Sequence, residues 1–189
     1  SEEVKWGLDG VVVSESRLSY IDGDAGELGY RGYAIEDFAR EASFEEVLSL
    51  LWNGDWPTPA ELDEFAARLS AERAIDSAVY DLIADLAARD ENPMSMLRTV
   101  TSALSAYDPD ADADPDDRTA NLAKGCRITA KLPTALATFD RLRNGGDPVE
   151  PREDLGHAEN FLYMLNNELP DEVAAEAFDT ALVLHADHG

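Results

Sequence analysis

Residues 43–62, SFEEVLSLLWNGDWPTPAEL, contain two helix starts and one helix end. Ser43 is followed three residues later by Glu46, which is the pattern of a capping box. The stretch Thr58-Pro59-Ala60-Glu61 repeats that pattern and adds proline at the first helical position. Gly54 ends the apolar run between the two starts. These signals predict two consecutive helices joined by a short turn.

The same helical spacing of apolar residues continues toward the end of the chain. Further helices are predicted around residues 79–86, from Asn92-Pro93 to residue 104 and around residues 155–165, and a last one from about residue 170 to the end. A long helix predicted over residues 118–143 is rich in small residues, which let another helix approach closely. The fold class is therefore predicted to be all-α.

The first 33 residues have a different pattern. The stretch GVVVSESRLSY is β-branched, and IDGDAG, which follows it, carries turn signals. Two short extended segments joined by a turn predict a small β-hairpin. We therefore expect an N-terminal hairpin segment over residues 1–33 and a helical domain over residues 34–189.

The chain of 189 residues carries 40 Asp plus Glu against 15 Lys plus Arg, a formal net charge of −25 at pH 7. This charge argues against nucleic acids and anionic membrane surfaces as partners, because both need clustered basic residues. Only three of the basic residues are lysines. Excess carboxylates with scarce lysine are typical of proteins that are soluble at high salt, where charge repulsion is screened. We predict a halophilic protein that loses structure at low salt.

Several features of the sequence predict a cytoplasmic location. The stretch SEEVKWGLDG is polar and acidic, unlike a signal peptide, and no run of 18 apolar residues predicts a membrane span. The single Cys126 excludes a disulfide within the chain and suits a reducing compartment. Helical periodicity around Cys126 predicts a small core residue.

Two acidic runs do not match a calcium-binding loop. From Asp108, the required Gly and Glu are replaced by Ala113 and Thr119, and the run from Asp22 has Gly one place too early. We interpret residues 108–117 as a solvated loop and expect no metal site.

The stretch LVLHADHG, residues 182–189, places His185 and His188 three apart with Asp187 between them. The zinc-protease pattern needs histidines four apart and a Glu, so zinc is not predicted. Two interpretations remain open: one core histidine with one at a helix C-terminus, or an imidazole directed at an anionic substrate. A third histidine, His157, lies near the start of a predicted helix and is expected to be a hydrogen-bonded core residue.

Six segments in order resemble the citrate synthase of archaea and many bacteria. Asn92 departs from the histidine of many relatives, which we interpret as a change of helix cap. The segments are GLDGVVVSESRLSYIDGDAGELGYRGYAIEDFA, SFEEVLSLLWNGDWPTPAEL, NPMSMLRTVTSALSAYD, KLPTALA, HAENFLYML and AFDTALVLHADHG.

The resemblance implies a mostly helical subunit with a large and a small domain. It implies condensation of acetyl-CoA with oxaloacetate to citrate and CoA, with acetyl-CoA as substrate and no metal or other cofactor. It further implies a homodimer through packed antiparallel helices, here about residues 93–106 and 118–142. By the same resemblance, His188 binds oxaloacetate and His185 gives structural support.

The resemblance also indicates what this chain lacks. In the family, the two catalytic histidines and the catalytic aspartate lie in the small domain, and they have no counterpart here. We therefore expect a large-domain portion truncated before the small catalytic domain, with no catalytic residue and no activity alone. Two alternatives stay open: a 2-methylcitrate synthase that uses propionyl-CoA, and a non-catalytic helical dimerisation fragment.

Overall fold

The N-terminal part forms a small antiparallel sheet. The computed structural model describes residues 15–187. Strands β1 (Ser19–Asp22), β2 (Glu27–Tyr30) and β3 (Tyr33–Ala34) pair in the order β1-β2-β3, with Ser19 opposite Tyr30. The predicted hairpin is therefore present as β1 and β2, and a third strand extends it past residue 33, where we expected the segment to end.

Seven α-helices follow the sheet in the described part of the chain, which confirms the all-α class. None of these helices is long and apolar enough to cross a membrane. Short 3-10 turns η1 (Ile35–Asp37) and η2 (Ser105–Tyr107) precede α1 and follow α4. The helices are α1 (Phe44–Asn53), α2 (Pro59–Ala71), α3 (Ser77–Ala88), α4 (Pro93–Leu104), α5 (Arg118–Arg143), α6 (His157–Asn166) and α7 (Glu172–Leu184).

The local helix signals act as the sequence predicted. The Ser43 hydroxyl accepts a hydrogen bond from the N–H of Glu46 at 3.2 Å, and the Glu46 carboxylate accepts one from the N–H of Ser43 at 2.8 Å. Thr58 and Glu61 form the same reciprocal pair at the start of α2. Gly54 ends α1 with a left-handed φ of 100°, a conformation that glycine adopts without strain.

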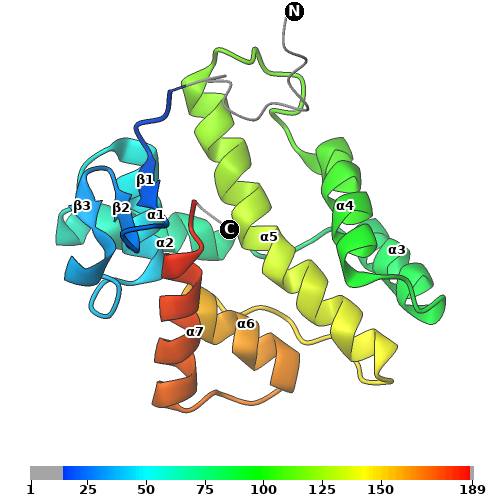
Figure 1. Cartoon of the computed structure of the whole chain (residues 1–189). Helices are drawn as coiled ribbons and strands as arrows, with labels where there is room; N and C mark the ends of the chain where they lie inside the picture. Colours follow the sequence, from blue (N-terminus) through cyan, green and yellow to red (C-terminus); the bar gives the residue numbers. More distant parts are fainter. Residues whose placement is uncertain (1–14, 188–189) are drawn as a thin grey trace, which may run out of the picture.

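Helix α5 is the centre of the fold. Figure 1 shows it running between the sheet with α1 on one side and the α3–α4 pair on the other. It packs against α2, α3, α4 and α6. Its buried face carries small residues, among them Cys126, Ala130 and Ala135, so neighbouring helices approach closely. The prediction that Cys126 is a small core residue is confirmed.

The acidic loop before α5 is less solvated than predicted. The guanidinium of Arg127 on α5 donates to the Asp108 carboxylate at 2.7 and 2.8 Å and to Asp110 at 2.6 Å. The side chains of Arg127 and Asp108 are only 14% and 12% exposed. The interpretation of residues 108–117 as a wholly solvated loop is therefore wrong at its start, because α5 supplies a partner that local sequence does not reveal.

Candidate functional site

The end of α7 carries the histidine segment. α7 begins after Asp171, whose side chain accepts a hydrogen bond from the N–H of Ala174 at 2.8 Å. The predicted continuation of this helix to the end of the chain is wrong, because α7 ends at Leu184 and His185 is its C-cap, with a non-helical φ of −112°. The N–H groups of His185 and Ala186 still donate to carbonyls three residues back, and the chain then turns toward the sheet.

The structure locates one of the two histidines predicted as site residues. His185 is exposed, and its Nδ1 lies 2.8 Å from the carbonyl oxygen of Ala181, one turn back on α7. This contact satisfies one carbonyl near the helix end, and the role of His185 as structural support stays a prediction. His188 lies outside the described residues.

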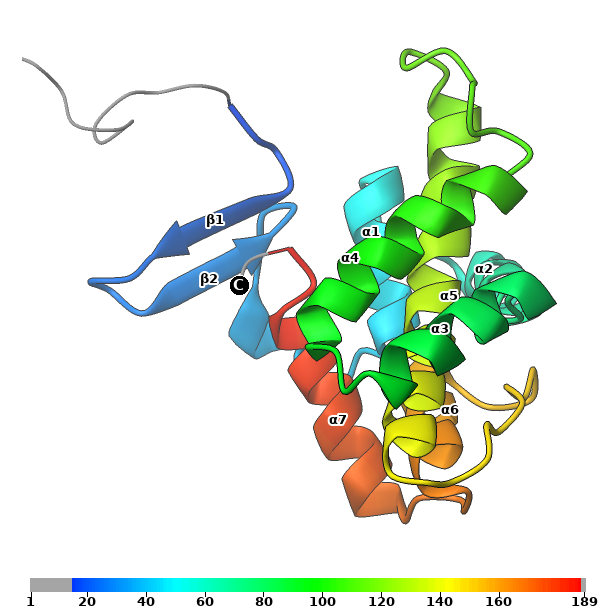
Figure 2. The same cartoon turned by 90° about the vertical axis from the view of Figure 1, so that its right-hand side faces the viewer.

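The turn after α7 is held by the sheet. The buried phenol of Tyr30 on β2 donates a hydrogen bond to the carbonyl oxygen of Leu184 at 3.2 Å. The hydroxyl of Ser19 on β1 donates to the carboxylate of Asp187. Figures 1 and 2 both show the end of α7, in red, beside strands β1 and β2. Sequence reasoning missed both contacts, because they join residues from opposite ends of the chain.

A buried polar cluster lies below this turn, where α1, α6 and α7 meet. The N–H of His157 donates to the Glu45 carboxylate at 2.7 Å, and the N–H of Phe44 donates to Asp179 at 3.1 Å. Glu45, His157 and Arg73 are 7%, 5% and 2% exposed. Ionisable side chains with so little exposure need partners, so this cluster constrains how the three helices pack.

The cluster shifts the ionisation of two of its members. Burial, with a smaller effect of Arg73, lowers the pKa of His157 to about 4. Burial raises the pKa of Asp179 to about 6, and the carboxylates of Glu45 and Glu46 add to the rise. The prediction that His157 is a core residue is confirmed, but its Nδ1 has no hydrogen-bond partner among the described residues.

An apolar groove of about 300 Å³ crosses α5 between α4 on one side and α6 and α7 on the other. Its walls include Leu97 of α4 and Leu132 of α5. Phe161 of α6 and Phe178 of α7 stack at 5.2 Å between ring centroids on the opposite wall. The groove therefore includes both helices that the sequence analysis assigned to a dimer interface and extends beyond them to α6 and α7.

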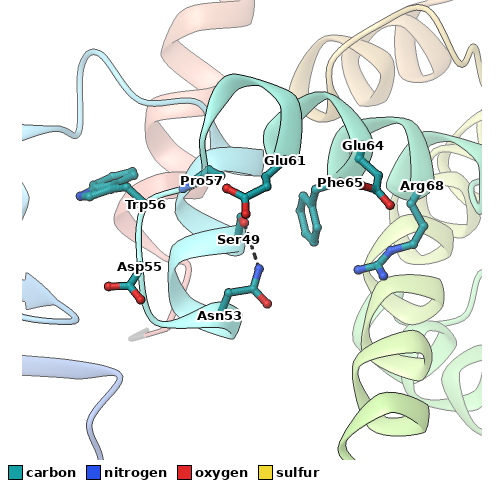
Figure 3. Close-up of a pocket in the computed structure, with 9 residues that line it drawn as sticks. All are labelled: Ser49, Asn53, Asp55, Trp56, Pro57, Glu61, Glu64, Phe65 and Arg68. Atoms are coloured by element: carbon teal, nitrogen blue, oxygen red, sulfur yellow. Dashed lines mark hydrogen bonds between the residues drawn. The ribbon is translucent and has the colours of Figure 1, made fainter.

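A larger hollow of about 640 Å³ lies between α1 and α2 (Figure 3). Its polar floor includes Asn53, whose amide donates to the Ser49 hydroxyl at 3.1 Å. Glu64, Phe65 and Arg68 of α2 line another part of the hollow, with Glu64 and Arg68 on the same side of the Phe65 ring in Figure 3. No residue of α7 lines this hollow, so it is separate from the histidine segment. Within residues 15–187, no group of three or more His, Cys, Asp or Glu side chains is arranged to hold a metal ion.

Comparison with known proteins assigns the family. The family model described as "Citrate synthase, C-terminal domain" matches residues 7–189. The chain belongs to the citrate synthase family. The resemblance found in the six segments is thereby confirmed.

Individual citrate synthases are similar over nearly the whole chain. The citrate synthase of Haloferax volcanii is 60% identical over 100% of this chain and 50% of its own length. The crystal structure of citrate synthase from Pyrobaculum aerophilum superposes with a TM-score of 0.90 at 36% identity, over 96% of this chain and 46% of that one. A 2-methylcitrate synthase of Mycobacterium tuberculosis is 42% identical over 99% of this chain and 46% of its own length. The chain thus spans about half the length of the relatives it matches.

Proposed function

We propose that this chain is the N-terminal half of a citrate synthase that condenses acetyl-CoA with oxaloacetate in the cytoplasm. The observation that carries the proposal is the end of α7. There the residues 185–187, His-Ala-Asp, follow the helix, and the carbonyl of Leu184 accepts a hydrogen bond from the buried Tyr30. The 60% identity to the Haloferax volcanii citrate synthase supports it. The net charge of −25 fits a halophilic enzyme of that kind.

In the proposed reaction, the methyl group of acetyl-CoA loses a proton and its carbon attacks the keto carbon of oxaloacetate. Hydrolysis of the thioester then releases citrate and CoA. The chain described here contributes binding and not proton transfer: His188 donates a hydrogen bond to oxaloacetate. The catalytic histidines and aspartate belong to a second half that this chain does not contain.

Activity measurements test whether this chain supplies substrate binding while the second half supplies the catalytic residues. The chain should release no CoA from acetyl-CoA and oxaloacetate when assayed alone, and should do so when joined to a C-terminal citrate synthase half. In that complete polypeptide, His188→Ala should raise the KM for oxaloacetate about ten- to a hundredfold, the range expected for a lost hydrogen bond to a charged ligand. The KM for acetyl-CoA should change little.

His185→Ala is the matched control. It should lower the melting temperature more than it changes the KM for oxaloacetate, because its described contact is to the Ala181 carbonyl within α7. If His185→Ala weakened oxaloacetate binding while His188→Ala did not, the two roles would be reversed.

A second candidate is 2-methylcitrate synthesis, supported by the 42% identity to the Mycobacterium tuberculosis enzyme. The complete polypeptide should be assayed with acetyl-CoA and propionyl-CoA at equal concentrations. A higher kcat/KM for propionyl-CoA would favour this alternative.

We further propose a homodimer formed by α4 and α5 of each copy, with α6 and α7 at its edge. The support is the apolar groove across these helices, since buried apolar surface drives association. Sedimentation at high salt should give twice the 20.6 kDa chain mass. Leu132→Lys, in the groove, should give monomer, whereas Val173→Lys on exposed α7 surface should not. A wild-type chain that sediments as monomer would support neither the dimer nor a dimerisation fragment.

A further inference from the structure

Tyr30 has an unusual position for a tyrosine. It is 0% exposed, and its ring packs 6.1 Å from that of Phe38 between centroids. A buried hydroxyl is unfavourable unless it forms hydrogen bonds. The partner of this hydroxyl is the carbonyl of Leu184, at the end of α7, where carbonyl groups lack partners within the helix.

The same phenol contacts the rest of the turn. Burial raises the pKa of Tyr30, and hydrogen bonds from the backbone N–H groups of Asp187 and Ala186 oppose that rise. The phenol is therefore neutral at physiological pH and keeps the proton that it donates to the Leu184 carbonyl.

Ser19 strengthens this attachment. It is the cross-strand partner of Tyr30 in the β1–β2 ladder, and its hydroxyl donates to the Asp187 carboxylate. Asp187 directly precedes His188 in the sequence. The cross-strand pair Ser19–Tyr30 thus contacts both ends of the turn at residues 184–187, which directly precedes His188 in the sequence.

We infer that Tyr30 is a positioning residue for oxaloacetate binding, because its hydroxyl fixes the turn that precedes His188. The inference rests on the proposed role of His188. It assigns a functional purpose to the N-terminal sheet, since β2 carries Tyr30 and β1 carries Ser19. A phenylalanine would fill the same space, so the hydroxyl group itself is what the inference concerns.

The test uses the complete polypeptide, at a salt concentration where its helical signal is at its maximum. Tyr30→Phe should raise the KM for oxaloacetate about three- to tenfold, the effect of one ordinary hydrogen bond, and leave the KM for acetyl-CoA unchanged. Ser19→Ala should act in the same direction. Tyr33→Phe is the matched control, because Tyr33 lies in the same sheet and its hydroxyl has no hydrogen-bond partner within the described residues.

A purely structural role would lower the melting temperature of Tyr30→Phe and leave its KM for oxaloacetate equal to that of Tyr33→Phe. That result, together with a raised KM in His188→Ala, would overturn the role of Tyr30 alone. An unchanged KM in His188→Ala would instead overturn the assignment of His188 and this inference with it.

Discussion

The carboxylate of Glu45 caps the N-terminus of α6: its Oε1 accepts a hydrogen bond from the N–H of His157 at 2.7 Å, although 112 residues separate the two. The N-cap residue of α6 is Gly156, which has no side chain to do this. A residue in the first turn of α1 therefore completes the start of α6. This contact couples α1 to α6, and both helices also pack against α7.

Replacing Glu45 should destabilise the fold in a graded way. Glu45→Ala leaves a buried N–H without a partner and should cost about 1.5–3 kcal/mol, whereas Glu45→Gln keeps an acceptor and should cost less. Thermal unfolding at fixed high salt measures both. Glu64→Ala is the control, because Glu64 is exposed and has no hydrogen bond or ion pair within residues 15–187.

Gly156→Ser offers a rescue of Glu45→Ala. A Cβ at Gly156 would have its nearest neighbour, Glu45 Oε1, at 3.8 Å, so a serine side chain fits and can cap α6. The double variant should be more stable than Glu45→Ala alone. Equal stability of the two would contradict the capping role of Glu45.

The stability of the fold should depend on pH through Asp179. The folded-state pKa is raised to about 6 from an ordinary value of 3.8, so the folded state binds this proton more tightly than the unfolded state. The resulting stability is fully present below pH 3.8 and is lost as the pH rises through 6. Asp179→Asn should therefore be more stable than the wild type at pH 7–8, and the difference should shrink as the pH falls.

The ionisation of His157 changes the stability of the fold in the opposite direction over part of this pH range. Its folded-state pKa is lowered to about 4 from 6.5, so its contribution is present above pH 6.5 and is lost as the pH falls toward 4. The pH profile of unfolding should be recorded for wild type and Asp179→Asn at constant high salt. A constant difference between the two from pH 4 to pH 8 would exclude the raised pKa of Asp179.

Low salt should unfold the chain. Its net charge of −25 produces self-repulsion, which about 1 M salt screens within about 3 Å and dilute salt does not. The helical circular dichroism signal should fall as KCl is diluted. A helical signal that stays unchanged in dilute buffer would contradict the halophilic interpretation.

Two loop variants separate repulsion from ion pairing. Asp112→Asn removes an exposed carboxylate and should shift the unfolding midpoint to lower salt. Asp108→Asn removes the same charge but also removes the ion pair with Arg127 and one of the two oxygens that accept from it, so it should shift the midpoint to higher salt. Equal shifts in the two variants would indicate that the Arg127 contacts contribute no stability.

The sequence by itself determined the helices and their starts. The capping pairs Ser43–Glu46 and Thr58–Glu61 join residues three apart, so the atoms that define them are neighbours in any helix. Helical spacing of apolar residues likewise located the helices other than α5, because it reports one buried face per helix. The family assignment also came from residue order, since six segments matched in sequence.

Only the tertiary structure decided which distant residues meet. Apolar spacing predicted that the last helix continues past Leu184, whereas the helix ends there, beside Tyr30 of β2. The partners of Glu45 and Asp108 also lie on other elements, and no local pattern contains them. Such contacts depend on how the helices pack. A side chain could bond to many different groups, and the packing determines which of these groups lies within hydrogen-bond distance. The candidate site at the end of α7 is therefore a product of both: sequence supplies its residues, and packing against the sheet fixes the turn that carries them.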